Sequence, residues 1–278
     1  MKNKIIKNKI IKKLALISMI GAMTISLISC GDKSKNKDGV EAIKSNGKVV
    51  VGLSADYAPY EFHAVIDGKD KTVGFDIDLA KEVARDLGVD LEIKEMEFDA
   101  LIGALQAGQI DMIISGMNPD EERKKQIDFS DIYYESKHGV LVVKDEMSNY
   151  KKPEDLNGKK IGAQLGSTQQ KIVETQIQAG NTTLLPNVNN LVLELKSKKV
   201  DAVVTEEPVA KMAMKSNPEL ALSDIKFEAE GGGNAVGVKK NSGELVEQIN
   251  KTIKRLQDSG ELDKFIVDAN DLAAQNQQ

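Results

Sequence analysis

Two groups of side chains in the sequence have the chemistry to bind the charged ends of a small molecule. In the first group, Ser115 and Gly116 follow a mainly apolar run, residues 110–114, that reads as a buried strand. They offer a hydroxyl, a carbonyl and an N–H that a ligand can approach closely, and Arg123 stands eight residues after Ser115. An arginine can hold a carboxylate through two parallel hydrogen bonds, which a lysine cannot reproduce. This group therefore suits a carboxylate.

The second group combines an acid with hydrogen-bond donors. Glu206 follows the strand-like run 200–205 and suits a cationic amino group. The stretch LGSTQQ (165–170) resembles a helix N-cap, in which Gly166, Ser167 and Thr168 supply N–H and hydroxyl donors to an anion. A carboxylate clamp beside an ammonium site matches an α-amino acid. Taken singly, each of these residues also fits a surface charge or a structural cap.

Arg123 lies in a run of six charges, residues 120–125. Mixed charges of this kind usually form a solvated face. Arg123 differs from its neighbours in its position after a strand end. That strand end has a counterpart at Thr205 and Glu206. We expect Arg123 to point into a cleft and the following residues to face solvent: Asp120, Glu121, Lys124 and Lys125.

No catalytic constellation is evident elsewhere in the sequence. It has neither a GxSxG motif nor a P-loop, and its two histidines, His63 and His138, stand alone. Each histidine reads as a surface or hinge residue. We therefore expect a binding protein and not an enzyme, with no cofactor and no metal ion.

Strands and helices alternate around these groups. Residues 48–53 and 110–115 read as buried strands, and residues 89–96 alternate as a strand does. Apolar residues recur at helical spacing up to Leu87, with Gly88 as a C-cap, and residues 99–108 read as a helix. This order predicts a parallel sheet covered by helices.

The same pattern recurs later in the chain. Residues 101–115 (LIGALQAGQIDMIIS) and 191–205 (LVLELKSKKVDAVVT) carry matching residues at identical offsets. Although any helix followed by a strand looks somewhat alike, the match favours two similar α/β lobes. Ligands collect beyond the carboxyl ends of strands in such sheets, so we expect a site between the lobes. The matching pairs are Leu101 and Leu191, Leu105 and Leu195, Asp111 and Asp201, and Ser115 and Thr205.

The remaining pattern predicts how the lobes are joined. Residues 234–240 read as a strand, and two helices follow at about 242–258 and 261–269. We expect the chain to cross between the lobes near 136–140 and 229–234. The second crossing contains EGGGNA (230–235), which fits a hinge and a plain glycine loop equally well.

The N-terminus has the features of an export signal. Six lysines precede an uncharged segment, residues 14–29, that is too short for a comfortable membrane span of about 20 residues. Leu27 to Cys30 (LISC) resembles a bacterial lipobox, in which the cysteine is lipidated, and Cys30 is the only cysteine. Removing residues 1–29 changes the formal net charge from −5 to −11, so the mature chain is a poor nucleic-acid binder.

The chain as a whole resembles the family 3 extracellular solute-binding proteins, which are the receptors of polar amino acid ABC importers. The resemblance covers nearly all of residues 45–270 and rests on SADYAPYEF (54–62), VGFDIDLAKEVA (73–84), FDALIGALQAGQID (98–111), ISGMNPDEERKKQIDFSD (114–131), LNGKKIGAQLGSTQQ (156–170) and VDAVVTEEPVA (200–210). It implies an α/β, two-lobed periplasmic-binding-protein fold of type II. In that fold each lobe is a mostly parallel sheet flanked by helices, and a two-strand hinge joins the lobes.

This fold implies a division of the chain. The expected parts are a lipoprotein signal peptide at 1–29, a polar tether at 30–45, a first lobe at 46–136 and 234–270, a second lobe at 140–229, and a C-terminal tail at 271–278.

The resemblance also implies roles for the polar groups. Arg123 matches the arginine that binds the ligand carboxylate, and Ser115 and Gly116 match main-chain contacts to the ligand. Glu206 matches the acid, usually an aspartate, that pairs with the α-amino group. The other implied positions are two aromatic residues that sandwich the ligand side chain and a set of second-lobe contacts. The predicted ligand-binding residues are Ser54, Tyr57, Phe98, Ser115, Gly116, Asn118, Arg123, Gln164, Ser167, Thr168, Gln169 and Glu206.

Two positions depart from the family's pattern. Asn118 stands where Thr or Ser is frequent beside the carboxylate, but its amide can still donate. Ser54 stands where members that grip cationic side chains carry Asp, and three nearby acids could compensate: Asp56, Glu61 and Asp99.

We therefore expect a monomeric receptor, lipid-anchored on the extracytoplasmic face of the cell membrane, that binds a free L-amino acid. The ligand is polar and, from the look of residues 52–71, basic, such as arginine or lysine. Its partners are ABC permease subunits, with no nucleic acid. Two alternatives stay open: a sensor lipoprotein that feeds no transporter, and an enzyme like the cyclohexadienyl dehydratases of this fold, for which Glu206 is the candidate acid.

Overall fold

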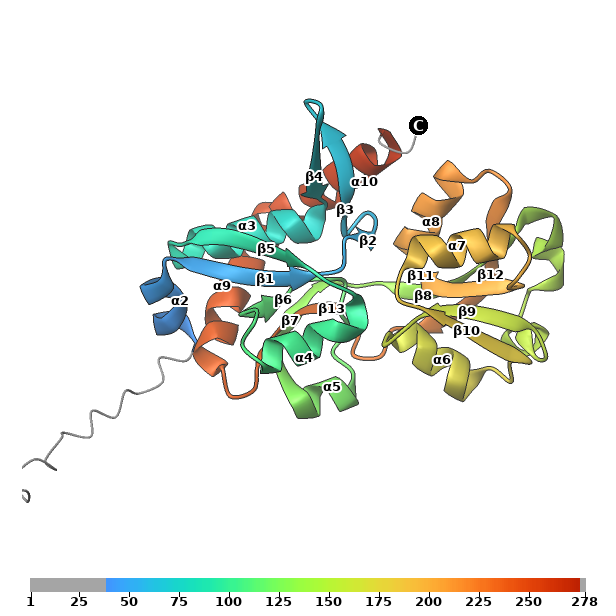
Figure 1. Ribbon diagram of the computed structural model, residues 1–278, viewed down its shortest axis with the longest axis horizontal. Helices are drawn as coiled ribbons and strands as arrows, with labels where there is room; N and C mark the ends of the chain where they lie inside the picture. Colours follow the sequence, from blue (N-terminus) through green and yellow to red (C-terminus); the bar gives the residue numbers. More distant parts are fainter. Residues whose placement is uncertain (1–38, 276–278) are drawn as a thin grey trace, which may run out of the picture. The chain divides into compact units, whose positions relative to one another are not determined.

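The computed structural model describes residues 39–275, and Figure 1 shows its ribbon. The predicted signal segment and Cys30 lie outside the described residues. Within 39–275, no helix is both long and apolar enough to cross a membrane.

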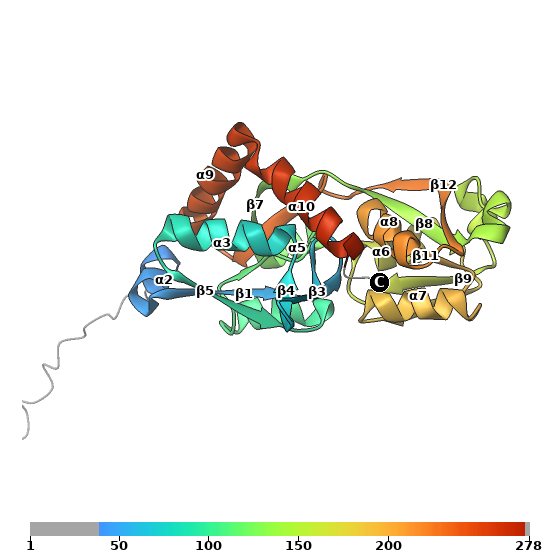
Figure 2. The same cartoon turned by 90° about the horizontal axis from the view of Figure 1, so that it is seen from above.

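The first of two five-stranded sheets carries most of its strands in one direction. β1 is parallel to its neighbours β5 and β6, whereas β13 runs antiparallel to β6 and β7. Three helices, α3 (Phe75–Leu87), α9 (Gly243–Ser259) and α10 (Glu261–Gln275), pack on one another over this sheet (Figure 2). In spatial order the strands are β5 (Asp90–Glu95), β1 (Lys48–Leu53), β6 (Met112–Ile113), β13 (Asn234–Lys239) and β7 (Ile127–Tyr134).

The second sheet repeats this arrangement. β9 is parallel to β10 and β11, and β8 runs antiparallel to β11 and β12. Its helices are α6 (Thr168–Gln176), α7 (Val188–Lys196) and α8 (Glu207–Ser216), so each sheet has its own helices (Figure 1). The prediction of mostly parallel sheets is therefore confirmed. In order the strands are β10 (Asn181–Leu185), β9 (Lys160–Gln164), β11 (Ala202–Glu206), β8 (Lys137–Val143) and β12 (Leu220–Glu228).

The match between residues 101–115 and 191–205 has a common structural basis. Asp111 accepts a hydrogen bond from the Val50 N–H at 2.8 Å, and its own N–H donates to the Val50 carbonyl. Asp201 makes the same pair of bonds with Lys160, at 2.8 and 2.7 Å. In each sheet, an aspartate at the start of one strand fixes the beginning of the neighbouring parallel strand.

The chain crosses between the sheets twice. It leaves the first sheet after Tyr134 and enters the second at Lys137, which is slightly earlier than the predicted 136–140. The difference arises because residues 137–140 already pair in β8 with β11 and β12. It returns between Glu228 and Asn234, at the predicted glycine-rich segment. The boundaries of the two lobes stay a prediction.

Several predicted elements differ in length. Residues 40–45, the end of the predicted tether, belong to α2 (Val40–Asn46), because Val40 and Ile43 are buried in the hydrophobic core beside the first sheet. Helix α10 continues to Gln275, past the predicted end at 269, because Ala273 packs under Phe62 and Met212. The strand expected at 110–115 pairs only at Met112–Ile113, but Gly88 ends α3 with φ 73° as predicted.

The remaining elements are short. A small antiparallel sheet joins β2 (Asp56–Tyr57), β3 (Glu61–Ile66) and β4 (Lys69–Val73). The others are η1 (Phe98–Ala100), α4 (Leu101–Gln106), α5 (Glu121–Gln126), η2 (Lys144–Asn149) and η3 (Pro153–Leu156).

Candidate functional site

The twelve predicted ligand-binding residues gather where elements of the first sheet meet α6. All twelve are buried. Eight residues line a small cavity, and all eight belong to the predicted set: Tyr57, Phe98, Gly116, Asn118, Arg123, Gln164, Thr168 and Gln169. The four others, Ser54, Ser115, Ser167 and Glu206, lie behind this lining.

Arg123 is the one cation in the cavity lining. Its Nη1 donates to the Asn118 carbonyl at 2.8 Å and its Nη2 to the Gly166 carbonyl at 2.9 Å. The guanidinium carbon lies 5.3 Å from the ring centre of Phe98. Burial lowers the pKa of the guanidinium, while nearby Asp120 opposes that shift. An arginine keeps its charge under these conditions, so its remaining N–H groups can serve an anion in the cavity.

Asp120 contradicts the expectation of a solvated face. It is only 6% exposed, because it is the N-cap of α5 and accepts the Arg123 N–H at 2.8 Å. Its second oxygen lies 3.8 Å from Arg123 Nε. Asp120 therefore fixes the helix turn that carries Arg123. The predicted solvent exposure of Glu121, Lys124 and Lys125 is confirmed.

Gly116 lines the cavity and Ser115 lies behind it, and we call this pair the shelf. Ser115 Oγ accepts the Ser54 N–H at 3.0 Å, which ties the shelf to the end of β1. Gly116 has φ 52°, and a Cβ there would lie 3.1 Å from the Tyr57 ring. The positive φ therefore favours glycine at this position, and a side chain would be in tight contact with the Tyr57 ring.

Asn118 links the shelf to α6 and β11. Its Oδ1 accepts the Thr168 hydroxyl at 2.7 Å. Its Nδ2 donates to the Gly233 carbonyl at 3.0 Å and to Glu206 Oε1 at 3.3 Å. Both ends of this amide are therefore engaged by protein groups.

Glu206 does not line the cavity, but it is hydrogen-bonded to Asn118, which does. Its carboxylate accepts bonds from Tyr60 Oη, from Asn118 and, at 3.0 Å, from Asn234 Nδ2. Burial raises the pKa of Glu206, and the hydrogen bond from Tyr60 opposes that rise. Glu206 thus places a negative charge near the shelf without lining the cavity.

The second-sheet residues divide into ligand-facing and structural groups. Ser167 caps α6, because its Oγ accepts the Gln170 N–H at 3.1 Å. Gln164 donates to the Pro186 carbonyl at 3.0 Å. Gln169 donates to Tyr57 Oη at 3.2 Å and lies 3.1 Å from His138 Nδ1. Ser167 therefore fits the structural-cap interpretation.

The two histidines have different environments. His138 is buried at the start of β8, and burial lowers its pKa to about 4, with Arg123 adding to the shift. His63 is exposed between Asp70 and Glu95, each at 3.0 Å. Neither belongs to a metal site, since residues 39–275 contain no group of three His, Cys, Asp or Glu side chains that would hold an ion.

Residues 49–268 match the bacterial extracellular solute-binding proteins, family 3. The chain belongs to this family. The family is extracellular, which places the mature protein outside the cytoplasm. The similar proteins are binding proteins, so the expectation of a binding protein rather than an enzyme is confirmed by the comparisons.

Two known proteins are similar to this chain over most of its length. The arginine-binding extracellular protein ArtP of Bacillus subtilis (strain 168) is 40% identical over 259 residues, which cover 91% of this chain and 96% of ArtP. A probable histidine-binding protein of Campylobacter jejuni is 33% identical over 261 residues, with coverages of 92% and 97%.

A solved structure gives the fold. The amino acid ABC transporter substrate-binding protein AbpA from Streptococcus pneumoniae, bound to L-arginine, superimposes with a TM-score of 0.82. It is 46% identical, and the match covers 84% of this chain and 99% of AbpA. The predicted α/β, two-lobed fold of type II periplasmic binding proteins is therefore confirmed.

The acids that could compensate for Ser54 in this solute-binding protein have other contacts. Asp56 accepts from Ser54 Oγ at 2.9 Å and from the Val188 N–H at 2.6 Å. Glu61 is fully buried and bonded to Ser115, whereas Asp99 is exposed on η1. None of the three lines the cavity at Arg123.

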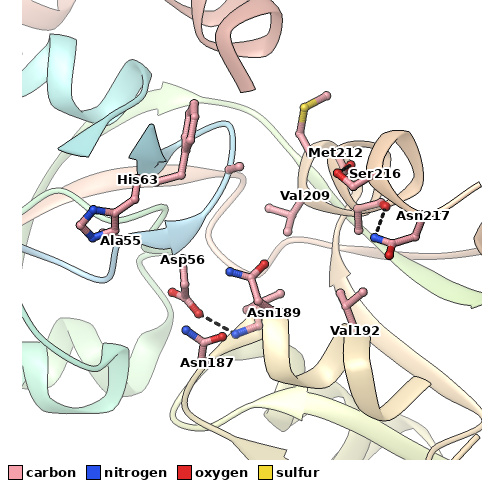
Figure 3. Close-up of a pocket in the computed structure, with 14 residues that line it drawn as sticks. Ala55, Asp56, His63, Asn187, Asn189, Val192, Val209, Met212, Ser216 and Asn217 are labelled. Carbon is pink, nitrogen blue, oxygen red and sulfur yellow. Dashed lines mark hydrogen bonds between the residues drawn. The ribbon is translucent and has the colours of Figure 1, made fainter. Parts of the chain in front are cut away.

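Asp56 lines two larger cavities. One of about 510 Å³ is bounded by β2, β3, α7 and α8, and Figure 3 shows the Asp56–Val188 hydrogen bond at its edge. The other, of about 610 Å³, carries the acids Asp56, Glu95 and Glu97. Of the predicted ligand-binding residues only Ser54 lines either cavity, so the candidate site is not the largest one.

The sequence analysis did not predict the supporting role of four residues: Tyr60, Glu61, Asp76 and Asn234. Glu61 was named there only as an acid that could compensate for Ser54. Asn234 donates to the Gly116 carbonyl at 2.6 Å and Tyr60 donates to Glu206. Three of these residues lie inside the quoted motifs YAPYEF and GFDIDL, and the fourth follows the glycines at the second crossing. The sequence signal that could have identified these residues is a polar side chain inside an otherwise apolar motif.

Proposed function

We propose that this solute-binding protein binds free L-arginine between its two lobes and delivers it to an ABC importer. Its lipid anchor is Cys30, at the end of the export signal. The two similar proteins ArtP and AbpA are named for arginine binding or carry arginine in their structure. The observation that carries the proposal is the AbpA likeness, since 46% identity extends over 84% of this chain.

The site supports recognition of the α-amino acid group. Two N–H groups of Arg123 donate to main-chain carbonyls, and its other N–H groups can donate to a ligand in the cavity. Glu206 sets a buried negative charge behind Asn118, on the side expected for the ligand ammonium. Opposite charges at the two ends would orient an amino acid in one direction.

Closure of the two lobes explains how the importer distinguishes the receptor with ligand from the receptor without it. Ligand docks first on Arg123 and the aromatic rings of Tyr57 and Phe98, and residues 167–169 then close over it. The ligand favours the closed state because it contacts both lobes, and closure strengthens each charged contact by removing water. The permease then recognises the closed form.

Calorimetry tests the ligand assignment. The secreted part of the chain, residues 31–278, is titrated with arginine, lysine, histidine, glutamine and cystine. We expect arginine to bind with a Kd of about 1 μM, or roughly −8 kcal/mol, and more tightly than the others. Binding of glutamine or cystine with failure of all three basic amino acids would overturn the proposal.

Uptake separates transport from sensing. Cells that lack the receptor should accumulate labelled arginine more slowly than cells that have it. Unchanged uptake, together with arginine binding in calorimetry, would instead favour the sensor alternative.

A further inference from the structure

Two buried carboxyl groups support the shelf from below. Glu61 on β3 and Asp76 on α3 are both 0% exposed. Ser115 Oγ donates to Glu61 Oε1. Asp76 Oδ2 accepts the Gly116 N–H at 2.8 Å and the Tyr133 hydroxyl at 2.9 Å. Each half of the shelf therefore rests on one of these acids.

The second oxygen of each carboxyl has no donor among the described residues. Glu61 Oε2 and Asp76 Oδ1 are both buried without a hydrogen-bond partner. The two carboxyl groups hold the adjacent residues Ser115 and Gly116, and each carboxyl group affects the pKa of the other. Two carboxylates can only accept hydrogen bonds, so a proton is needed between them to satisfy both oxygens.

The surroundings supply no cation to replace that proton. Neither acid forms an ion pair with Lys, Arg or His among residues 39–275. The titratable groups that act on the pair are the acids Asp56 of β2 and Glu206 of β11 and the neutral tyrosines Tyr57 of β2 and Tyr133 of β7. None of them is a cation, and two adjacent buried carboxylates beside two further acids would repel one another.

We propose that Glu61 and Asp76 share one proton and act together as the positioning pair that fixes the Ser115 hydroxyl and the Gly116 N–H beneath the ligand. The proton belongs on Glu61, because Asp76 already accepts two hydrogen bonds that favour its ionised form. Glu61 then donates to Asp76 and accepts from Ser115. This inference rests on the proposed function in one respect, namely that the shelf contacts the ligand.

The titration behaviour agrees with this geometry. Burial raises the pKa of Glu61 well above its usual value of 4.5, with nearby Asp76 adding to the rise. Burial also raises the pKa of Asp76 to about 7, against the hydrogen bond from Gly116. Since both pKa values are higher in the folded chain than in the unfolded chain, protonation of the pair favours folding, and this contribution is fully present below about pH 4. It decreases as the pH rises, and the part that comes from Asp76 is lost as the pH passes about 7.

Amide substitutions distinguish a shared proton from two independent acids. In Glu61→Gln the amide can donate to Asp76 and accept from Ser115, and in Asp76→Asn the amide can donate to an ionised Glu61. The double variant brings two N–H groups face to face and must leave a buried polar group unpaired. We expect each single variant to bind arginine within about threefold of wild type. We expect the double variant to bind at least about tenfold more weakly than the two single effects combined.

Infrared spectroscopy tests the proton without relying on ligand binding or on a folded double variant. Wild-type residues 31–278 should show a buried carboxylic acid band at pH 7 that disappears as the pH is raised and is missing in Glu61→Gln. Thermal unfolding of Glu61→Gln should also depend less on pH than that of wild type. Absence of the acid band at pH 7, or additive effects in the double variant, would overturn the shared proton. If wild type does not bind arginine, the proposed function fails, and the infrared and unfolding tests still decide this inference.

Discussion

Arg123 Nη2 on α5 lies 2.9 Å from the main-chain carbonyl oxygen of Gly166, in the loop that precedes α6. The guanidinium therefore joins an element beside the first sheet to an element of the second. The same group is the only cation in the cavity lining. The side chain that we propose to bind the ligand carboxylate thus also makes an inter-lobe contact.

Replacing Arg123 by alanine should weaken arginine binding by at least about a hundredfold. The substitution removes the partner of the ligand carboxylate and leaves buried acceptors at Asn118 and Gly166. Loss of one partner from a buried charge pair commonly costs roughly 3–5 kcal/mol. Isothermal titration of the two proteins measures the change.

Lys124→Ala is the matched control for Arg123. Lys124 is adjacent in the sequence but exposed, with its ammonium 3.0 Å from Glu121. Exposed pairs contribute little, so its affinity should stay within about twofold. If Arg123→Ala also stays within a few-fold of wild type, the assignment of the carboxylate clamp is wrong.

Gly166→Ala should weaken ligand binding through a clash across the site. Gly166 has φ 75°, and a Cβ there would lie 2.7 Å from Asp99 Cβ and 3.0 Å from Asp99 Cα on η1. The loop would have to withdraw from η1 to make room, which moves the carbonyl that accepts from Arg123. We expect at least about tenfold weaker binding, measured by calorimetry, because the buried Arg123 donor loses its acceptor.

Gly158→Ala controls for the backbone strain alone. Gly158 has a nearly identical φ of 72°, but a Cβ there meets nothing within 4 Å. Both variants should unfold at a lower temperature, by an amount that corresponds to roughly 1 kcal/mol. Only Gly166→Ala should lose affinity, and an equal loss in both variants would count against the clash.

The sequence was sufficient to predict the fold because local patterns coincide with the structure. Asp111 and Asp201 occupy equal offsets after similar helices, and each exchanges two hydrogen bonds with the neighbouring strand. The aspartate that recurs at a strand start therefore predicted a contact that occurs in both sheets. The alternation of strands and helices likewise follows hydrophobic periodicity, which the sequence displays directly.

The environment of single charges was harder to predict. Asp120 and Lys124 are both charged residues in one short run, yet Asp120 caps α5 and Lys124 faces solvent. The two environments differ because Asp120 stands directly before the first turn of α5 and Lys124 does not. Glu61 and Asp76 lie 15 positions apart, and their proximity arises from the packing of β3 against α3. Nothing in the spacing of these two residues indicates that contact.

Replacing Cys30 by alanine should release the protein from the membrane. Stable anchoring of a protein requires more than one acyl chain, and a lipidated Cys30 would supply them at the new N-terminus. Cells fed with labelled palmitate should label the wild type and leave Cys30→Ala unlabelled and in the soluble fraction. Ser34→Ala, which lies just beyond the lipobox, should label as wild type does. Membrane retention of unlabelled Cys30→Ala would refute the anchor.

Asp56→Asn should weaken ligand binding by roughly two- to tenfold. The Asp56 carboxylate accepts the Val188 N–H at 2.6 Å, at the first residue of α7, while its other oxygen accepts from Ser54. A negative charge at a helix N-terminus contributes about 0.3–1 kcal/mol, and up to about 2 kcal/mol when partly buried. Asparagine keeps the shape of the side chain but removes that charge, so the contact between β2 and α7 becomes weaker.

Two measurements check the role of Asp56. Calorimetry gives the affinity, and the distance between spin labels on the two lobes gives the fraction of closed molecules without ligand. Asp263→Asn on α10 is the control, because Asp263 is an exposed acid far along the chain from this contact. We expect a smaller closed fraction and weaker binding for Asp56→Asn alone. Weaker binding with an unchanged closed fraction would show that Asp56 acts on the ligand and not on closure.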